Sequence, residues 1–234
     1  MGTPAKRPPG RPKDEQLGAR RTEEILDVAA RVFAARGYPS TDVQVVADEV
    51  GVGKGTIYRY FPTKRDLFLA AVDRGMRRLT AHTDASMTAE DPLEQLEQAV
   101  RAYLSFFEAN SEFVELLIQE RAEFRDRPKP TYFEYCDANV GKFKTIVQRV
   151  IAEGRIRNLP VDSITNVVGD LMYGTMFTNY FARRQRSLEE QADDILDIVQ
   201  NGLLTAAERA RRVSDPRDVK PPSNAESTSD SRNR

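Results

Sequence analysis

The chain has 234 residues, of which 40% are hydrophobic, and its 35 lysine and arginine residues nearly balance 36 aspartate and glutamate residues. This length and composition fit one or two small domains with a buried core. The longest stretch without a charged residue is Leu171–Ala182, only 12 residues, whereas a membrane-spanning helix needs roughly 18 or more apolar residues. The basic N-terminus has no apolar core segment and does not resemble a secretory signal. We therefore expect a cytoplasmic protein with no membrane partner.

Few side chains suit metal or nucleophilic chemistry. The single cysteine, Cys136, excludes an internal disulfide and a cysteine-based metal cage, and the single histidine, His82, removes most metal and triad chemistry. The acidic and basic residues between 115 and 126 allow an acid/base or carboxylate metal site. A solvated helix face with ion pairs between residues four apart is the favoured interpretation. We expect no catalytic residue, no metal and no cofactor.

The near-zero net charge hides an asymmetry along the chain. Residues 1–80 carry 15 basic and 10 acidic residues, whereas the remainder carries 20 basic and 26 acidic residues. A basic N-terminal part before an acidic one indicates a module that binds a polyanion, followed by a part with another role.

Apolar residues recur at helical spacing almost throughout, and no stretch alternates as a half-buried strand would, so an all-α fold is predicted. We expect a disordered basic arm over residues 1–20, a DNA-binding domain over 21–82, a helical dimerisation and effector domain over 83–213, and a disordered tail over 214–234. Caps and breakers bound about nine helices. They are expected at residues 21–36, 43–50, 54–60, 63–82, 92–108, 112–126, 131–153, 161–184 and 187–212.

The second and third predicted helices are short and are joined by Gly51–Val52–Gly53, the proportions of a helix-turn-helix. The second helix of such a motif enters a DNA major groove about 12 Å wide, which favours small and short polar residues at its leading edge. Lys54, Gly55 and Thr56 supply them. An N-terminal helix-turn-helix unit is therefore predicted.

The segment Thr41–Ala47, followed by Gly51–Phe68 with the sequence GVGKGTIYRYFPTKRDLF, resembles the TetR family of bacterial transcription regulators. The resemblance runs from about Arg21 to Val72, and the remainder is similar only in size and helical build. The family pattern implies DNA contacts at Lys54, Gly55, Thr56, Tyr58, Arg59 and Tyr60, and a phosphate contact at Lys64. Asp42 stands where the family usually has Ser or Thr, and because a carboxylate repels phosphate we assign it no DNA contact.

Two further DNA contacts are expected from the residues themselves. Gln44, at the start of its helix, is placed to reach a phosphate or an adenine edge. Arg11 lies in a Gly-Arg-Pro segment flanked by basic residues, which suits an A·T-rich minor groove and equally fits a plain charged tail.

The last two predicted helices are apolar over more than half of their circumference, more surface than a monomer of this size readily buries. We expect a homodimer formed through these helices, an arrangement that the TetR resemblance also implies. A two-fold protein then requires a palindromic DNA operator.

A mixture of aromatic, thioether and amide side chains in the later helices suits a small, largely apolar ligand, although each residue fits a packed core as well. The candidates are Tyr103, Phe107, Tyr135, Asn139, Met172 and Met176. The predicted function is a homodimeric repressor released from double-stranded DNA by a small-molecule effector. The alternatives are a regulator or architectural protein without a ligand, and an all-helical enzyme with a fortuitous motif.

Overall fold

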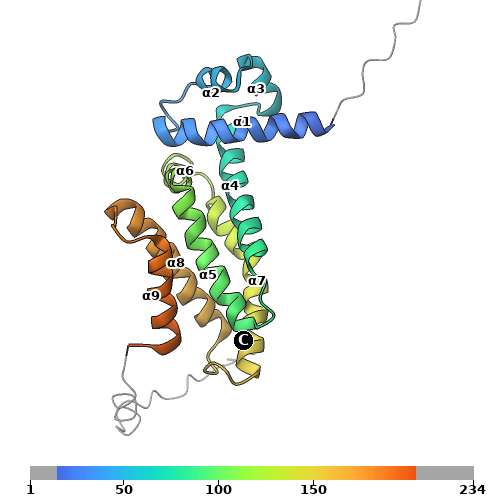
Figure 1. Cartoon of the computed structure of the whole chain (residues 1–234). Helices are drawn as coiled ribbons and strands as arrows, with labels where there is room; N and C mark the ends of the chain where they lie inside the picture. Colours follow the sequence, from blue (N-terminus) through green and yellow to red (C-terminus); the bar gives the residue numbers. More distant parts are fainter. Residues whose placement is uncertain (1–14, 204–234) are drawn as a thin grey trace, which may run out of the picture. The chain divides into compact units, whose positions relative to one another are not determined.

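The computed structural model describes residues 15–203, and the chain divides into two compact units, residues 1–196 and 197–234. Over the described residues there are nine α-helices and no strand, as the sequence predicts (Figure 1). Their bounds are α1 Glu15–Arg36, α2 Val43–Val50, α3 Lys54–Tyr60, α4 Lys64–Ser86, α5 Pro92–Ala109, α6 Ser111–Glu123, α7 Thr131–Ala152, α8 Val161–Ala182 and α9 Leu188–Asn201. No helix in this described part is long and apolar enough to cross a membrane.

The helices α1, α2 and α3 pack together at the N-terminal end of α4 (Figure 1). Their shared core is apolar and closed to water, with Ile25, Phe33, Ile57 and Phe68 all 0% exposed. Because α4 contributes Phe68 here and continues to Ser86, it joins this unit to the helices that follow. The domain boundary expected at residue 82 falls inside this unbroken helix.

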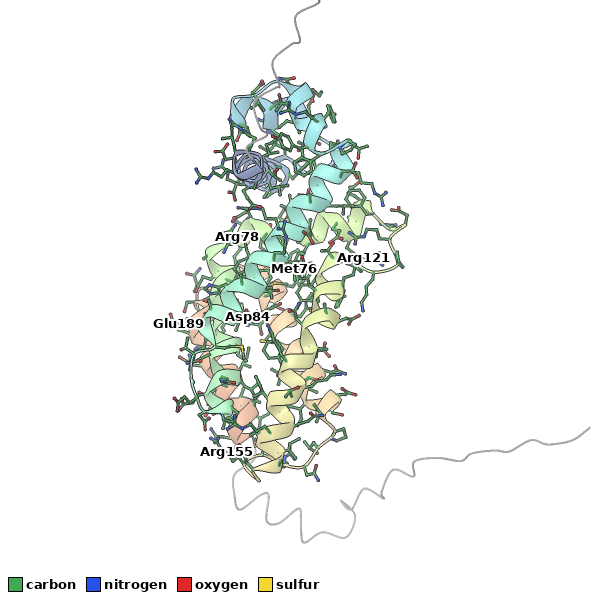
Figure 2. All side chains as sticks on the ribbon, turned by 90° about the vertical axis from the view of Figure 1, so that its right-hand side faces the viewer. Met76, Arg78, Asp84, Arg121, Arg155 and Glu189 are labelled. Carbon is green, nitrogen blue, oxygen red and sulfur yellow. The ribbon has the colours of Figure 1, made fainter. Side chains whose placement is uncertain are left out.

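The following helices form a bundle in which α4, α5 and α7 pack against one another and α8 contacts α5, α6 and α7. In Figure 2, Met76 of α4 lies toward the inside of the bundle and Arg78 toward its edge, matching their buried and exposed positions. Gly75 marks the closest approach of α4 to α6, because a Cβ there would overlap the ring of Phe113. The bundle is therefore tightly packed where α4 leaves the N-terminal unit.

Two helix bounds differ most from the sequence-based expectation. The first helix begins at Glu15, so Glu15–Arg20 is helical and not part of a disordered arm. Leu17, the large apolar residue of this segment, is 63% exposed. The pattern of buried apolar residues in the sequence therefore gives no sign that the segment is helical. The last helix ends at Asn201, because Gly202 adopts a positive φ of 72°. Residues 1–14 and 204–234, including Arg11 and the expected tail, lie outside the described residues.

The charged stretch at 115–126 is a solvated surface only in part, because Arg121, Glu123, Arg125 and Asp126 are exposed whereas Glu120 is buried. Glu120 is 1% exposed, and its Oε1 atom accepts hydrogen bonds from the Thr131 backbone N–H at 3.0 Å and from Arg127 at 2.7 Å. The carboxylate thereby caps the start of α7, where Pro130 supplies no side-chain cap. Within residues 15–203, no group of three acidic, histidine or cysteine side chains is arranged to hold a metal ion.

Candidate nucleic-acid interface

The turn between α2 and α3 is fixed by backbone chemistry. Asp42 caps α2 by accepting a 2.8 Å hydrogen bond from the Gln44 backbone N–H. Gly51 ends the helix in the left-handed region at φ 75°, which favours glycine, and the Val52 N–H then donates to the Ala47 carbonyl at 2.9 Å. The helix-turn-helix geometry expected from the sequence is therefore present.

Helix α3 presents most of its predicted DNA contacts to solvent. Ile57 is buried in the apolar core, whereas Gly55, Tyr58 and Arg59 are exposed. Thr56 and Tyr60 are half-buried beside them. The unit thus offers a short helix with a glycine, a hydroxyl, a phenol and a guanidinium on its outer side, the groups that read base edges and contact phosphates.

Five of the predicted contacts, Lys64 among them, already have partners within the chain. The Lys54 ammonium donates to Asp42 at 2.6 Å, and the Gln44 side chain donates to Asp48 at 2.7 Å. The guanidinium of Arg59 lies over the Tyr60 ring at 5.3 Å. The backbone hydrogen bond from Gln44 and the Lys54 ammonium lower the pKa of Asp42, and the hydrogen bond to Asp42 raises the pKa of Lys54.

Lys64 has a structural role that the sequence does not reveal. Its ammonium donates to the backbone carbonyls of Tyr38, Pro39 and Thr41 at 2.9, 3.2 and 3.1 Å, and lies 4.6 Å from the Tyr38 ring centroid. These three bonds use all three ammonium donors. The phosphate contact that the family resemblance implies would require one of them to break. Lys64 instead fastens the α1–α2 connection to the start of α4.

Polar contacts also join the three-helix unit to the bundle. Arg65 of α4 pairs with Asp126 after α6 at 2.6 Å, and the buried Gln119 side chain of α6 donates to the Phe33 carbonyl of α1 at 3.0 Å. Gln119 also donates to Glu115 at 3.0 Å, and Glu115 accepts the Tyr180 hydroxyl of α8 at 2.7 Å. Apart from the Gln119–Glu115 contact, which joins residues four apart, these pairs are far apart in sequence, and no local pattern marks them.

The residues predicted to bind a ligand fall into two groups in the structure. Tyr103, Phe107 and Met176 are buried together, and Tyr103 bonds the Tyr132 hydroxyl at 2.8 Å and the Met176 sulfur at 3.8 Å. Burial raises the pKa of Tyr103 and of Tyr132, so both hydroxyls stay protonated. This group provides buried hydroxyls beside apolar rings and a thioether.

The second group lies nearer the surface. Tyr135 donates to Asp73 of α4 at 2.7 Å, and partial burial together with that carboxylate raises the pKa of Tyr135 to about 12. Asn139 is half-buried and donates to the Tyr135 carbonyl one turn earlier, so it needs no ligand to satisfy its amide. Met172 is half-buried against the core. An open depression of about 510 Å³ lies away from both groups, at the α7–α8 turn beside Leu159.

The outer side of α8 is apolar and open to solvent. Met176 is its only buried residue, whereas Val167 is 58%, Leu171 41% and Phe181 66% exposed. In α9, Ile198 is 46% and Val199 44% exposed, whereas Leu196 is buried within the chain. An exposed apolar strip of this kind marks an interaction surface.

A capped helix, a glycine turn and an exposed short helix on a three-helix core define a DNA-binding protein of the helix-turn-helix class. Residues 25–71 match the family model described as bacterial regulatory proteins, tetR family. This N-terminal segment therefore resembles the TetR family of bacterial transcription regulators, and the relatives found for the chain are transcription regulators.

The relatives include both activators and repressors. The transcriptional activator FasR of Mycolicibacterium smegmatis is 32% identical over 109 residues, which cover 46% of this chain and about half, 48%, of FasR. The repressor KstR2 of the same species is 27% identical over 188 residues, covering 79% of this chain and 91% of KstR2. The Bacillus subtilis regulator FadR in complex with stearoyl-CoA shares the fold, with a TM-score of 0.66 at 19% identity over 78% of this chain and 99% of that one.

Proposed function

We propose that the protein is a homodimeric, sequence-specific transcription regulator, and most simply a repressor, that binds a palindromic operator through α3. The observation that carries this proposal is the exposed outer side of α3 on a buried three-helix core. Gln44, Lys54, Gly55, Thr56, Tyr58, Arg59 and Tyr60 are the proposed DNA contacts. Lys64 is left out because its ammonium already serves three carbonyls.

The test is DNase footprinting on fragments that flank the gene, with wild-type protein and Thr56→Ala. A defined protected site that weakens or shifts in the variant is expected, because Thr56 stands where α3 meets base edges. An architectural protein would protect no defined site, and an enzyme would leave no footprint. Transcription in vitro from the same fragment separates repression from activation, the two activities found among the relatives.

Dimerisation is proposed through the last two helices, with the exposed strip of α8 at its centre. Phe181→Arg places a charge on a side chain that is 66% exposed in the single chain, so the variant should fold and remain monomeric. Leu196→Glu is a poor test, because Leu196 is only 8% exposed and a charge there would disturb the monomer itself. Sedimentation at micromolar concentration distinguishes the outcomes, and a monomeric wild type would contradict the proposal.

The proposed effector is a small molecule with a substantial apolar part, bound among α5, α7 and α8. The support is the buried group of Tyr103, Phe107 and Met176, which combines hydroxyl, aromatic and thioether surfaces. The FadR complex shows that a similar fold binds stearoyl-CoA. A thermal-shift screen of acyl compounds, dyes and apolar drugs, run with wild type and Met172→Trp, tests the site. A stabilising compound should also release the operator and should act less on the variant.

We propose that the N-terminal arm, residues 1–14, increases the affinity for DNA. Residues 1–14 contain four basic residues, among them Arg11, and one acidic residue. Deleting residues 1–14 should weaken DNA binding at low salt. If Arg11 enters the minor groove, the loss is larger on operators flanked by A·T tracts than on those flanked by G·C, and equal losses would indicate a purely electrostatic tail.

A further inference from the structure

Asp42 is an acidic side chain within the proposed DNA-binding surface, where it pairs with Lys54, a predicted DNA contact. Asp42 precedes α2, and its Oδ1 atom accepts both the Gln44 backbone N–H at 2.8 Å and the Lys54 ammonium at 2.6 Å. Lys54 is the first residue of α3, so the ion pair links the beginnings of both helices of the motif. A DNA phosphate that binds the Lys54 ammonium must therefore displace the Asp42 carboxylate.

The electrostatic surroundings hold Asp42 ionised. The backbone N–H of Gln44 and the Lys54 ammonium lower its pKa, and the nearby charge of Lys64 acts in the same direction. Lys64 is bound to three carbonyls, so its ammonium does not compete for the Asp42 oxygen at hydrogen-bond distance. The carboxylate thus neutralises Lys54 at neutral pH and also presents a negative charge next to the approaching backbone.

We propose that Asp42 competes with DNA phosphate for Lys54 and so lowers the affinity for DNA of any sequence. Binding through phosphates alone supplies nearly all of the non-specific affinity, and each neutralised phosphate adds about 0.9 to the slope of log K against log salt. Withholding one ammonium weakens non-operator binding, where no base contact compensates. The inference rests on the proposed DNA binding.

The decisive variant is Asp42→Asn, which keeps an oxygen for the Gln44 N–H and so preserves the cap, but removes the charge. Binding to a non-operator duplex should tighten about eightfold at 0.1 M salt, and the salt slope should steepen by about 0.9, the contribution of one phosphate contact. The affinity for the operator should increase by no more than the same factor, because the base contacts are unchanged. The ratio of operator to non-operator affinity therefore does not rise.

Two further variants separate this effect from a general change in charge. Glu49→Gln removes one exposed negative charge from the same helix without touching the Asp42–Lys54 pair, and should leave the slope close to that of wild type. Asp42→Asn combined with Lys54→Met should lose the gain seen in Asp42→Asn alone. Titrations of all four proteins at several salt concentrations give the complete comparison.

Equal changes in Asp42→Asn and Glu49→Gln would overturn the inference, because net charge alone would then explain them. It would also fail if the gain persisted without Lys54. Wild-type protein that binds no DNA in these titrations would refute the proposed function and the inference together, whereas normal operator binding with an unchanged Asp42→Asn slope would refute the inference alone.

Discussion

Replacing Lys64 by Met tests whether this residue stabilises the fold or contacts DNA. Methionine keeps much of the aliphatic length but removes the ammonium that serves the Tyr38, Pro39 and Thr41 carbonyls. Hydrogen bonds to charged groups contribute roughly 1.5–3 kcal/mol each when well buried. Lys64 is half-buried, so water can replace part of its hydrogen bonding to the carbonyls. We therefore expect the free energy of unfolding of Lys64→Met to be about 2–3 kcal/mol lower than that of the wild type.

For a protein of this size, 1 kcal/mol shifts the melting temperature by about 2–4 °C, so Lys64→Met should melt about 4–12 °C lower. Urea denaturation gives the free energy directly, with an unchanged m-value showing that the unfolded state is the same. Lys54→Met serves as the matched control, because it removes a half-buried lysine that is held by a single ion pair, with Asp42. It should unfold like the wild type.

DNA titrations with the same proteins give the second half of the test. Lys64→Met should keep the wild-type salt slope at temperatures where it is folded. In the wild type the three ammonium donors of Lys64 already bind carbonyls, so none is left for phosphate. An unchanged free energy of unfolding in Lys64→Met would refute the structural role. A slope reduced by about 0.9 would restore Lys64 as a phosphate contact.

Four other substitutions have definite expected outcomes. Gly75→Ala should lower the free energy of unfolding by about 1–3 kcal/mol in a melt, because the new Cβ would overlap the Phe113 ring; wild-type stability would contradict the close packing of α4 and α6. Phe181→Arg should sediment as a folded monomer without operator binding, and a stable dimer would place the interface elsewhere. Tyr58→Phe should weaken binding to all DNA sequences alike in titrations, whereas Thr56→Ala should change the preferred sequence; the reverse pattern would exchange their assigned roles.

The helix-turn-helix could be predicted because its signals are local. Asp42 at the cap, Gly51 at a positive φ and Ile57 on the buried side all act within a few residues of their own position. The bounds of α2 and α3 therefore agree with the apolar pattern and the breakers. Residue types on the outer side of α3 follow from the same periodicity.

Contacts between distant segments could not be predicted in this way. The carbonyls that surround Lys64 come from a connection more than 20 residues earlier, and the partner of Gln119 lies in α1. The position of Asn139, half-buried with a backbone partner, also depends on the packing of α7 and could not be predicted. Which side of a helix faces its neighbours depends on packing that a single sequence does not specify.

The central claim is that two copies of this chain read a specific DNA sequence through α3. Selection of binding sites from a random double-stranded library with the purified full-length protein tests it most directly. The account predicts enrichment of one palindromic sequence, whose half-sites lie about one helical turn apart and whose base preferences change in Thr56→Ala. A library that shows no enrichment, or a single unsymmetrical site bound by one copy, would contradict it.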